Sequence, residues 1–287
     1  MGIVIQGLSH IYMDGTPFAK TALSGINMVI DKGSFAGLIG PTGSGKSTLI
    51  QHIAGLLKPT KGTVRIEETV VGPETKKMGP LRNRVGLVFQ YPEHQLFEES
   101  VAKDIAYGPH NQGLNEEEVH RRVFQAMEWV GLDPELSSRS PFQLSGGQMR
   151  RAAIAGVLAM QPEVLILDEP TAGLDPAGQR ELLDTVYQLH REQGMTVILV
   201  SHSMEEIARY ADILFVIKDG RLMLTGSPGE VFAEGERLRE WGLEIPVVAR
   251  LVDELNQRLT SPIPREIFTV NALERHLWSR WRKGEKG

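Results

Sequence analysis

The most informative segment of this 287-residue chain is Gly40-Pro41-Thr42-Gly43-Ser44-Gly45-Lys46-Ser47. It matches the pattern G-x-x-x-x-G-K-[ST], and it lies between a short apolar run at residues 35–39 and a helix-compatible run that begins at residue 46. Small residues let the backbone N–H groups of such a loop close around a polyphosphate at the N-terminus of a helix. The pattern predicts a nucleotide-binding loop, and a glycine-rich turn without a ligand is the alternative interpretation.

Two side chains of this loop have predicted roles. Lys46 would reach the β- and γ-phosphates of ATP, and the Ser47 hydroxyl would ligate Mg²⁺. Contacts with the nucleotide are expected along the whole loop and into the first helical turn. The residues concerned are Gly40, Pro41, Thr42, Gly43, Ser44, Gly45, Lys46, Ser47 and Thr48.

A second apolar run, at residues 164–167, ends in two acids, Asp168 and Glu169. Phosphoryl transfer needs carboxylates at the end of a buried strand, so Asp168 is predicted to hold Mg²⁺ and Glu169 to activate or orient the attacking water. His202 and Gln90 each follow other apolar runs. Because the carboxyl ends of parallel strands meet at one edge of a sheet, both are expected at the same site, with the Gln90 amide sensing Mg²⁺ or water. Purely structural roles for these side chains are the alternative.

The order of the apolar runs predicts an α/β fold. The runs at residues 164–167 and 197–200 flank a helical stretch at residues 177–193, which is the pattern of a βαβ unit. Between residues 92 and 160 the pattern is helical throughout. The pair Asp219-Gly220 between two further apolar runs predicts an antiparallel hairpin that closes the sheet.

Composition excludes several classes of function. The formal net charge is -5 and the chain has no cysteine, so binding to nucleic acid through overall basic charge, disulfides and thiol catalysis are not expected. The absence of cysteine fits a reducing cytoplasm. The longest uncharged stretch has 13 residues, whereas a membrane-spanning helix needs about 20 mostly apolar residues.

The pentapeptide Leu144-Ser145-Gly146-Gly147-Gln148 resembles the signature of the ATP-binding-cassette (ABC) superfamily. The other elements of that superfamily follow in its order: the phosphate loop at 40–47, Gln90 as the Q-loop, 164–169 as the Walker B strand, 172–175 as the D-loop, and His202 as the H-loop. The resemblance implies a head-to-tail dimer in which Ser145, Gly147 and Gln148 of one subunit, with Asp175, contact ATP held on another. It also matches Tyr12 to the aromatic residue that stacks on adenine, with an ordinary strand aromatic as the alternative.

Finer features at residues 15–18, 88–97 and 144–151 closely resemble the ATPase subunits of energy-coupling-factor (ECF) transporters, and most of all the second of their two paralogous ATPases. The family imports vitamins and transition-metal ions. The resemblance implies a P-loop ABC ATPase core with a mixed sheet and a helical signature subdomain. It implies a heterodimer with the paralogous ATPase, docked at the cytoplasmic face of the membrane on a transmembrane coupling protein. Several substrate-binding membrane subunits would share that coupling protein. Lys46, Glu169 and His202 are the implied catalytic residues, and all are present.

Two domains are predicted. Residues 1–234 would form the ATPase domain, with the helical subdomain at about 92–160, and residues 235–287 a C-terminal helical dimerisation domain that holds three of the four tryptophans. The aromatic stretch from Gln90 to Phe97 is hypothesised to line a groove that receives helices of the coupling protein, with Leu96 and Phe97 in contact. Core packing beneath the helical insert is the alternative for that stretch.

The motifs also allow functions other than a shared ECF transporter. A soluble ABC protein of DNA repair or translation would need a long coiled-coil insertion or a second cassette, and this chain has one signature and a short separation between Lys46 and Asp168. A cassette that binds ATP without hydrolysis is disfavoured by the presence of Glu169. A dedicated cobalt or nickel importer with a homodimeric ATPase stays open. The transported substrate is not encoded here, because in this architecture another polypeptide recognises it.

Overall fold

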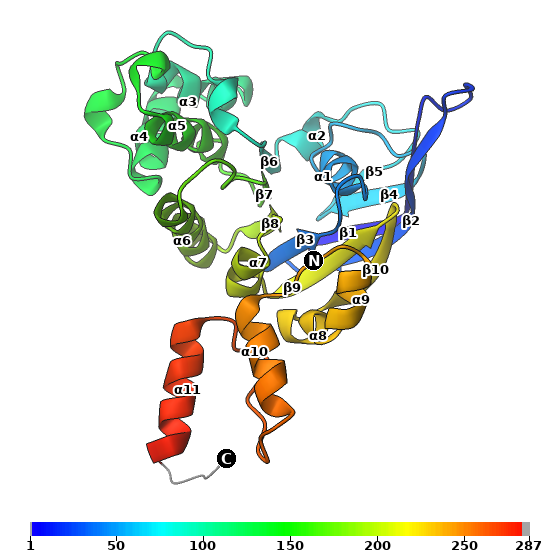
Figure 1. The fold of residues 1–287 in the computed structure, drawn as a ribbon. Helices are drawn as coiled ribbons and strands as arrows, with labels where there is room; N and C mark the ends of the chain where they lie inside the picture. The colour runs from blue at the N-terminus through cyan, green and yellow to red at the C-terminus, as the bar shows by residue number, and fades with distance from the viewer. Residues whose placement is uncertain (1, 283–287) are drawn as a thin grey trace.

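The computed structural model describes residues 2–282, and its strands form two sheets (Figure 1). The central sheet has six strands in the order β10-β9-β3-β8-β7-β6, of which all but β10 run parallel to their neighbours. Its strands are β3 (Phe35–Ile39), β6 (Val85–Val88), β7 (Val164–Asp168), β8 (Thr196–Val200), β9 (Ile213–Lys218) and β10 (Arg221–Gly226). The predicted α/β class and the mixed sheet are confirmed.

The second sheet is antiparallel, in the order β2-β1-β4-β5. Its strands are β1 (Ile3–Tyr12), β2 (Lys20–Ile30), β4 (Lys61–Ile66) and β5 (Thr69–Val71). Along the last half of β2, buried and exposed residues alternate, because one face of this sheet packs on the core and the other meets solvent. In Figure 1 the hairpin between β1 and β2 projects from the body of the molecule.

Alternate residues of the central sheet supply two separate cores. Phe35 and Leu165 point into one hydrophobic cluster with the helical insert, whereas their neighbours Ala36 and Ile166 point into another with the antiparallel sheet and α1 (Lys46–Ile53). Both faces are therefore covered, and this explains why every residue of β3 and β8 is buried and why all of them but Thr196 are apolar.

The chain between β6 and β7 is helical, as its pattern predicts. It contains η1 (Pro92–Gln95), α3 (Val101–Asn111), α4 (Glu116–Trp129), η2 (Pro134–Leu136), η3 (Pro141–Gln143) and α5 (Gly146–Leu158). Asn115 caps α4 by accepting the backbone N–H of Glu118, as expected for an asparagine before an acidic first turn. Figure 1 shows these helices grouped apart from the antiparallel sheet. We refer to them as the helical lobe.

The predicted βαβ unit and the predicted hairpin are both present. Helix α6 (Pro176–Gln193) connects the parallel neighbours β7 and β8, and α7 (Met204–Tyr210) follows β8. A short helix, α2 (Gly79–Arg82), precedes β6. Asp219 and Gly220 both have positive φ angles, 49° and 71°, and reverse the chain between β9 and β10.

The C-terminal helices pack in two different places. They are α8 (Pro228–Ala233), α9 (Gly235–Glu240), α10 (Val247–Asn256) and α11 (Val270–Arg282). Leu238 and Ile245 belong to the hydrophobic cluster that holds Phe35 and the helical lobe, which we call the large core. Helices α10 and α11 instead share a small separate cluster around Val252 and Leu273. The division at residue 235 stays a prediction, and this packing favours a later boundary, after Ile245. The last five residues of the predicted dimerisation domain, 283–287, lie outside the described residues.

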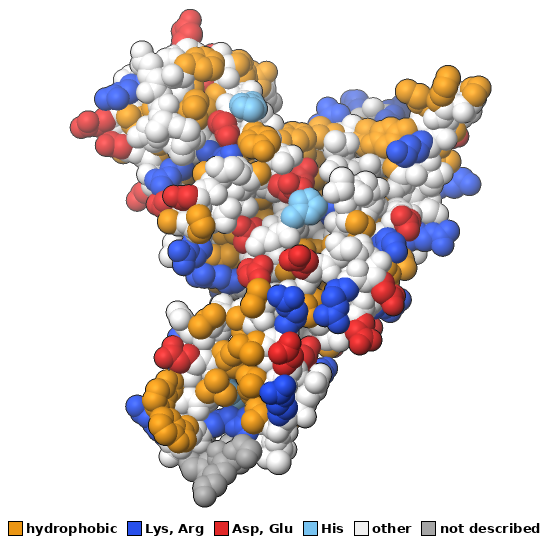
Figure 2. All heavy atoms as spheres, in the orientation of Figure 1, with side chains coloured by type: hydrophobic (Ala, Val, Ile, Leu, Met, Phe, Trp, Pro, Cys, Tyr) orange, Lys and Arg blue, Asp and Glu red, His pale blue; other side chains and the backbone are white. Residues whose placement is uncertain are grey.

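Figure 2 shows hydrophobic side chains gathered on α10 and α11 at the bottom of the view. Exposed side chains there include Leu251, Trp278 and Trp281. Within residues 2–282, none of the helices has both the length and the apolar character required to span a bilayer.

Candidate functional site

Two of the three glycines in the loop between β3 and α1, Gly40 and Gly45, leave no room for a side chain. A Cβ atom at Gly40 would lie 2.1 Å from the carbonyl oxygen of Ile217, and one at Gly45 would lie 2.7 Å from the carbonyl oxygen of Ala22. Gly45 also has a φ angle of 106°, a value that L side chains rarely adopt. At these glycines no side chain covers the backbone, so the backbone N–H groups at the start of the helix are accessible. This is the arrangement that binds phosphate.

Lys46 is the first residue of α1, and its ammonium group folds back over the loop. Its Nζ donates to the carbonyl oxygens of Gly40 at 2.7 Å and Pro41 at 3.1 Å, which leaves a third donor for a ligand oxygen. Burial lowers the pKa of Lys46, and the charges of Glu169 and Asp168 oppose that shift. The Ser44 hydroxyl is buried without a hydrogen-bond partner among the described residues. A polyphosphate would satisfy these groups.

The acids at the end of β7 lie where the sequence predicts, at the edge of the sheet beside the loop. Glu169 Oε1 is 2.9 Å from His202 Nε2, and Glu169 Oε2 accepts a hydrogen bond from Gln90 Nε2 at 3.2 Å. The three strands β6, β7 and β8 thus bring together three residues that are far apart in the chain. Burial and the neighbouring charge of Glu169 raise the pKa of Asp168, and the charges of Lys46 and His202 oppose the increase.

The backbone at Glu169 has an unusual conformation. Its φ angle is 50°, in the left-handed region that is uncommon for residues other than glycine. Its N–H donates to the Val200 carbonyl at 2.9 Å, and its carbonyl accepts the N–H of Ala172 at 3.2 Å. The side chain of Glu169 is therefore directed by a tight turn over residues 169–172. Strain of this kind is found at functional sites, where surrounding contacts maintain it.

Tyr12 lies at the end of β1, beside the helix that follows the phosphate loop. Its hydroxyl is 3.1 Å from the hydroxyl of Thr48, and its ring meets the edge of His10 with centroids 4.5 Å apart. With 39% of its surface exposed, it can offer a ring face to a ligand base. Phe18, in the loop after β1, is exposed as well. Among the described residues, no hydrogen bond or ring contact joins it to the phosphate loop.

The signature residues lie elsewhere, at the start of α5. Ser145 caps that helix by accepting the N–H of Gln148, and the Gln148 side chain accepts the N–H of Ser145 in return. Gly147 lies in the first turn. Among the described residues, no hydrogen bond or ion pair joins this helix start to residues 40–48. The structure therefore does not bring the predicted signature contacts to the chain's own phosphate loop.

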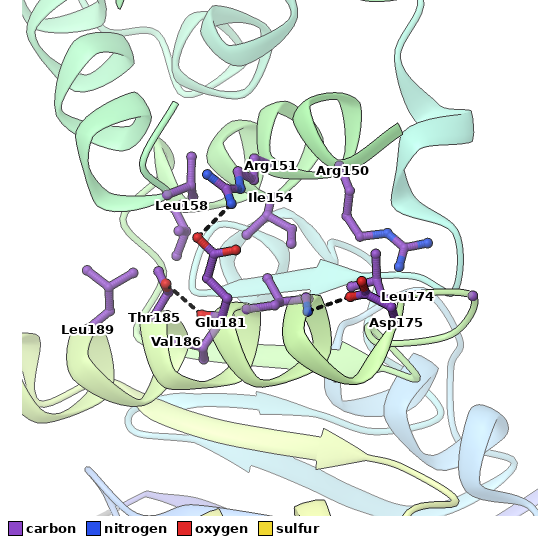
Figure 3. A pocket seen from close by; sticks show the side chains of 15 residues that line it. Arg150, Arg151, Ile154, Leu158, Leu174, Asp175, Glu181, Thr185, Val186 and Leu189 are labelled. Atoms are coloured by element: carbon purple, nitrogen blue, oxygen red, sulfur yellow. Dashed lines mark hydrogen bonds and ion pairs between the residues drawn. The ribbon is translucent and has the colours of Figure 1, made fainter. Parts of the chain in front are cut away.

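Asp175 caps α6 by accepting the N–H of Gly178 at 2.7 Å. A cavity of 410 Å³ separates this end of α6 from α5, and Arg151 crosses it to pair with Glu181 at 2.7 Å (Figure 3). The predicted D-loop residue is thus next to the signature helix and on the same side of the molecule.

The hypothesised groove residues differ in their exposure. Leu96 is only 8% exposed and belongs to the large core, whereas Phe97 is 59% exposed. The ring of Phe97 packs edge-on against exposed Tyr107 of α3 with centroids 5.1 Å apart, and Tyr91 is also exposed. We call Tyr91, Phe97 and Tyr107 the aromatic strip. For Leu96 the alternative interpretation, core packing, is the one that holds.

Glu93 and Arg150 are two further functional candidates. They lie within residues 88–97 and 144–151, and no role is predicted for either of them from the sequence. The Arg150 guanidinium donates to both carboxylate oxygens of Glu93, at 2.9 and 2.7 Å. These residues are 57 positions apart in the chain, so no local pattern or periodicity could have paired them.

A buried pair of histidines lies behind the phosphate loop. His52 of α1 and His10 of β1 have ring centroids 4.7 Å apart. His52 Nδ1 is 3.1 Å from the Leu57 carbonyl and must carry the proton, whereas its Nε2 and both nitrogens of His10 are buried without a partner among the described residues. Burial, reinforced by His10, lowers the pKa of His52 to about 4.

We expect His52 to make the protein acid-sensitive. Unfolded His52 takes up a proton near pH 6.5, but folded His52 does so only near pH 4. Stability should therefore fall as the pH drops below about 6.5, by up to about 1.4 kcal/mol per pH unit from this group. Urea unfolding at pH 7.5, 6.5 and 5.5 measures the slope. The variant His52→Asn keeps a donor near Leu57 and should make the free energy of unfolding less dependent on pH. The control His120→Asn, at an exposed histidine, should leave the pH dependence of wild type unchanged. Equal pH dependence in wild type and His52→Asn would contradict the assignment.

The chain is similar in sequence to known proteins along most of its length. A family model described as ABC transporter matches residues 23–172. The energy-coupling factor transporter ATP-binding protein EcfA2 of Caldanaerobacter subterraneus subsp. tengcongensis is 52% identical over 286 residues, which covers 100% of this chain and 99% of that protein. The protein of the same name from Clostridium perfringens is 53% identical over 272 residues, covering 94% of this chain and 95% of its own.

Solved structures show the same fold. The structure of cbiO1 from Clostridium perfringens, described as part of the ABC transporter complex cbiONQ, has a TM-score of 0.73 at 41% identity, over 88% of this chain and 98% of that one. The ATP-binding cassette MJ0796, solved as a dimer in a post-hydrolysis state with ADP and Pi, has a TM-score of 0.70 at 27% identity, over 79% of this chain and 98% of its own.

Proposed function

Since this chain belongs to the ABC transporter family and, within it, to the ATP-binding proteins of energy-coupling factor transporters, we propose that it hydrolyses ATP to drive uptake of a vitamin or a transition-metal ion. ATP binds at residues 40–48, with Tyr12 against the adenine. One observation carries the proposal. The Glu169 carboxylate is held by Gln90 and His202 at the edge of the central sheet where the phosphate loop begins.

In the proposed reaction, Glu169 accepts a proton from the attacking water. Its two carboxylate oxygens are fixed by different partners, so the group is oriented before the nucleotide arrives. Lys46 directs its remaining donor to the phosphates, where positive charge stabilises the transferring group. His202 approaches the γ-phosphate from the end of β8.

The oxygen donors around the loop suit Mg²⁺, which prefers hard oxygen ligands. The Ser47 hydroxyl, the Asp168 carboxylate and the Gln90 side-chain oxygen would hold the ion. The Gln90 amide nitrogen is already bonded to Glu169, so its oxygen is the group that can turn to a metal. When bound, Mg²⁺ supplies charge neutralisation at the β- and γ-phosphates.

A second ATPase subunit completes the site. Ser145, Gly147 and Gln148 begin a helix that has no recorded bond to residues 40–48 within the described chain, which supports their use on nucleotide held by another subunit. Asp175 belongs to the same interface. The partner in this proposal is the paralogous ECF ATPase, and a homodimer in a dedicated cobalt or nickel importer is the outcome that would replace it.

The remaining partners are membrane proteins: a transmembrane coupling protein and the separate substrate-binding subunits. The aromatic strip is the surface proposed to receive the coupling protein, because its three side chains are exposed and Tyr91 directly follows Gln90 in the chain. The chain would then act at the cytoplasmic face of the cell membrane as a peripheral subunit, with no nucleic-acid partner.

The test is recovery of partners with the tagged chain from detergent-solubilised membranes of its host. We expect a second ABC ATPase, one polytopic membrane protein and several small membrane proteins. The double variant Phe97→Asp with Tyr107→Asp should lower recovery of the membrane proteins at least fivefold, because it places charges on an exposed apolar contact, while the ATPase partner stays bound. Val70→Asp, at an exposed apolar site on β5, is the matched control.

Each other outcome of this experiment would exclude one part of the proposal. Unchanged recovery with the double variant would exclude the aromatic strip as the docking surface. A single ATPase species with one dedicated membrane set would replace the shared ECF system with a metal-ion importer. Recovery of no membrane protein by the wild-type chain would overturn the transport function.

A further inference from the structure

Arg150, in the second turn of α5, joins that helix to two other segments of the chain, η1 and the turn that follows β7. Its Nε and Nη2 donate to the Glu93 carboxylate at 2.9 and 2.7 Å. Its Nη1 donates to two backbone carbonyls, Ala172 at 2.9 Å and Pro170 at 3.3 Å. One planar guanidinium thus holds a carboxylate on one side and a loop on the other, an arrangement that the single ammonium of lysine cannot reproduce.

The arrangement is buried. The Arg150 side chain is 6% exposed and that of Glu93 is 17% exposed. Burial alone would raise the pKa of Glu93, but the hydrogen bonds and the charge of Arg150 outweigh it and hold that pKa below its ordinary value. A buried ion pair with a further set of carbonyl acceptors has little freedom to rearrange, because breaking any one bond leaves a desolvated group without a partner.

The bonds of Arg150 connect two segments that have proposed functional roles. Pro170 and Ala172 belong to the turn that begins at Glu169, and the N–H of Ala172 closes that turn on the Glu169 carbonyl. Glu93 lies in η1, three residues after Gln90, and η1 is flanked by Tyr91 and Phe97 of the aromatic strip. Arg150 therefore stands between the turn that directs Glu169 and the segment proposed to meet the membrane partner.

A second contact joins the same two segments. The Tyr91 ring lies 3.7 Å from the position that a Cβ atom would take at Gly173, where φ is 76°. Residue 173 directly follows the carbonyl that Arg150 holds. The segment after Gln90 and the segment after Glu169 are thus packed together at two points.

We propose that Arg150 is a positioning residue that fixes the backbone of the Glu169 turn to the Glu93 segment. A displacement at the aromatic strip then reaches that turn through the Arg150 guanidinium group, in addition to the direct bond between Gln90 and the Glu169 side chain. The inference rests on the proposed function. It assigns Arg150 a role in ATP turnover and none in ATP binding, because residues 40–48 are shaped by other parts of the chain.

The neighbouring Arg151 provides a matched control. Figure 3 shows the side chain of Arg150 running toward the loop at Leu174 and Asp175, whereas that of Arg151 is directed to Glu181 of α6. Arg151 also donates to the Gly131 carbonyl at 3.0 Å and bonds to no residue of the Glu169 turn or of the Glu93 segment. Both residues are arginines of α5 in ion pairs, and only the first touches the Glu169 turn.

The experiment measures kcat and KM for ATP in the membrane complex that copurifies with the tagged chain. Arg150→Met should lower kcat at least tenfold and leave KM within twofold. Arg150→Lys, which keeps the charge, should still lower kcat at least threefold, because one ammonium cannot bond to the carboxylate and both carbonyls at once. Arg151→Met should retain kcat within twofold.

Glu93→Gln tests the other end of the connection. It should lower kcat by itself, and adding it to Arg150→Met should lower kcat by less than a further twofold, because both changes break one connection. Additive losses, or an Arg150→Lys complex with at least half the wild-type kcat, would overturn the inference. So would an Arg150→Lys change that alters KM as much as kcat. A wild-type complex without any ATP turnover would instead overturn the proposed function, and the inference with it.

Discussion

Glu169→Gln is expected to lower steady-state ATP hydrolysis by about 10²–10⁴-fold while ATP binding stays within a few-fold of wild type, since general base catalysis contributes rate enhancements of that size. Glutamine has the shape of glutamate, and its one side-chain oxygen can still accept a hydrogen bond from Gln90 or from His202, whose nitrogens lie 3.2 and 2.9 Å from the Glu169 oxygens. It cannot accept a proton from water. The change therefore removes the chemistry and leaves the architecture.

Phosphate release by the purified complex measures the rate, and titration with a fluorescent ATP analogue measures the affinity. Glu163→Gln is the matched control, because Glu163 is a carboxylate at the other end of β7 that pairs with Arg84 at 2.6 Å, away from the loop. A Glu169→Gln complex with a rate within tenfold of wild type would assign the base to another group.

Lys46→Met is expected to weaken ATP binding by about 100-fold, the loss that follows from removing a charge-assisted bond worth about 3 kcal/mol. Methionine has a similar length and fills the same buried space, but it has no donor for phosphate. The carbonyls of Gly40 and Pro41, which accept bonds from Lys46 Nζ, would also lose their partner.

Calorimetric titration with MgATP measures this loss directly. Lys103→Met, at an exposed lysine of α3 that pairs with exposed Glu99, serves as the control and should bind ATP as wild type does. An affinity within threefold of wild type in Lys46→Met would show that backbone N–H groups alone hold the phosphates.

The features that the sequence predicted well depend on residues adjacent in the chain. The strand at residues 35–39, the helix start at Lys46 and the turn at Asp219-Gly220 each follow from a few consecutive side chains and their backbone preferences. The meeting of Gln90, Glu169 and His202 was predictable for a related reason, because parallel strands end at one edge of a sheet whatever their separation in sequence.

Packing of neighbours was harder to predict. Leu96 and Phe97 are adjacent and both apolar, yet one belongs to the core and the other is exposed, because the backbone after η1 turns one inward and the other out. The division at residue 235 stays a prediction. Leu238 and Ile245 lie after it and yet belong to the same hydrophobic cluster as Phe35, a membership that only the packed structure shows.

Local conformational preference and strand order encode the phosphate loop, the order of strands and helices, and the polar residues at the strand ends, so these features follow from the amino-acid sequence. The bonds of Arg150 to Glu93 and to the turn after Glu169, and the contact of His10 with His52, exist only in the packed chain. Such pairs join segments 20 or more residues apart, and their energy comes from burial and geometry that exist only once the segments have packed.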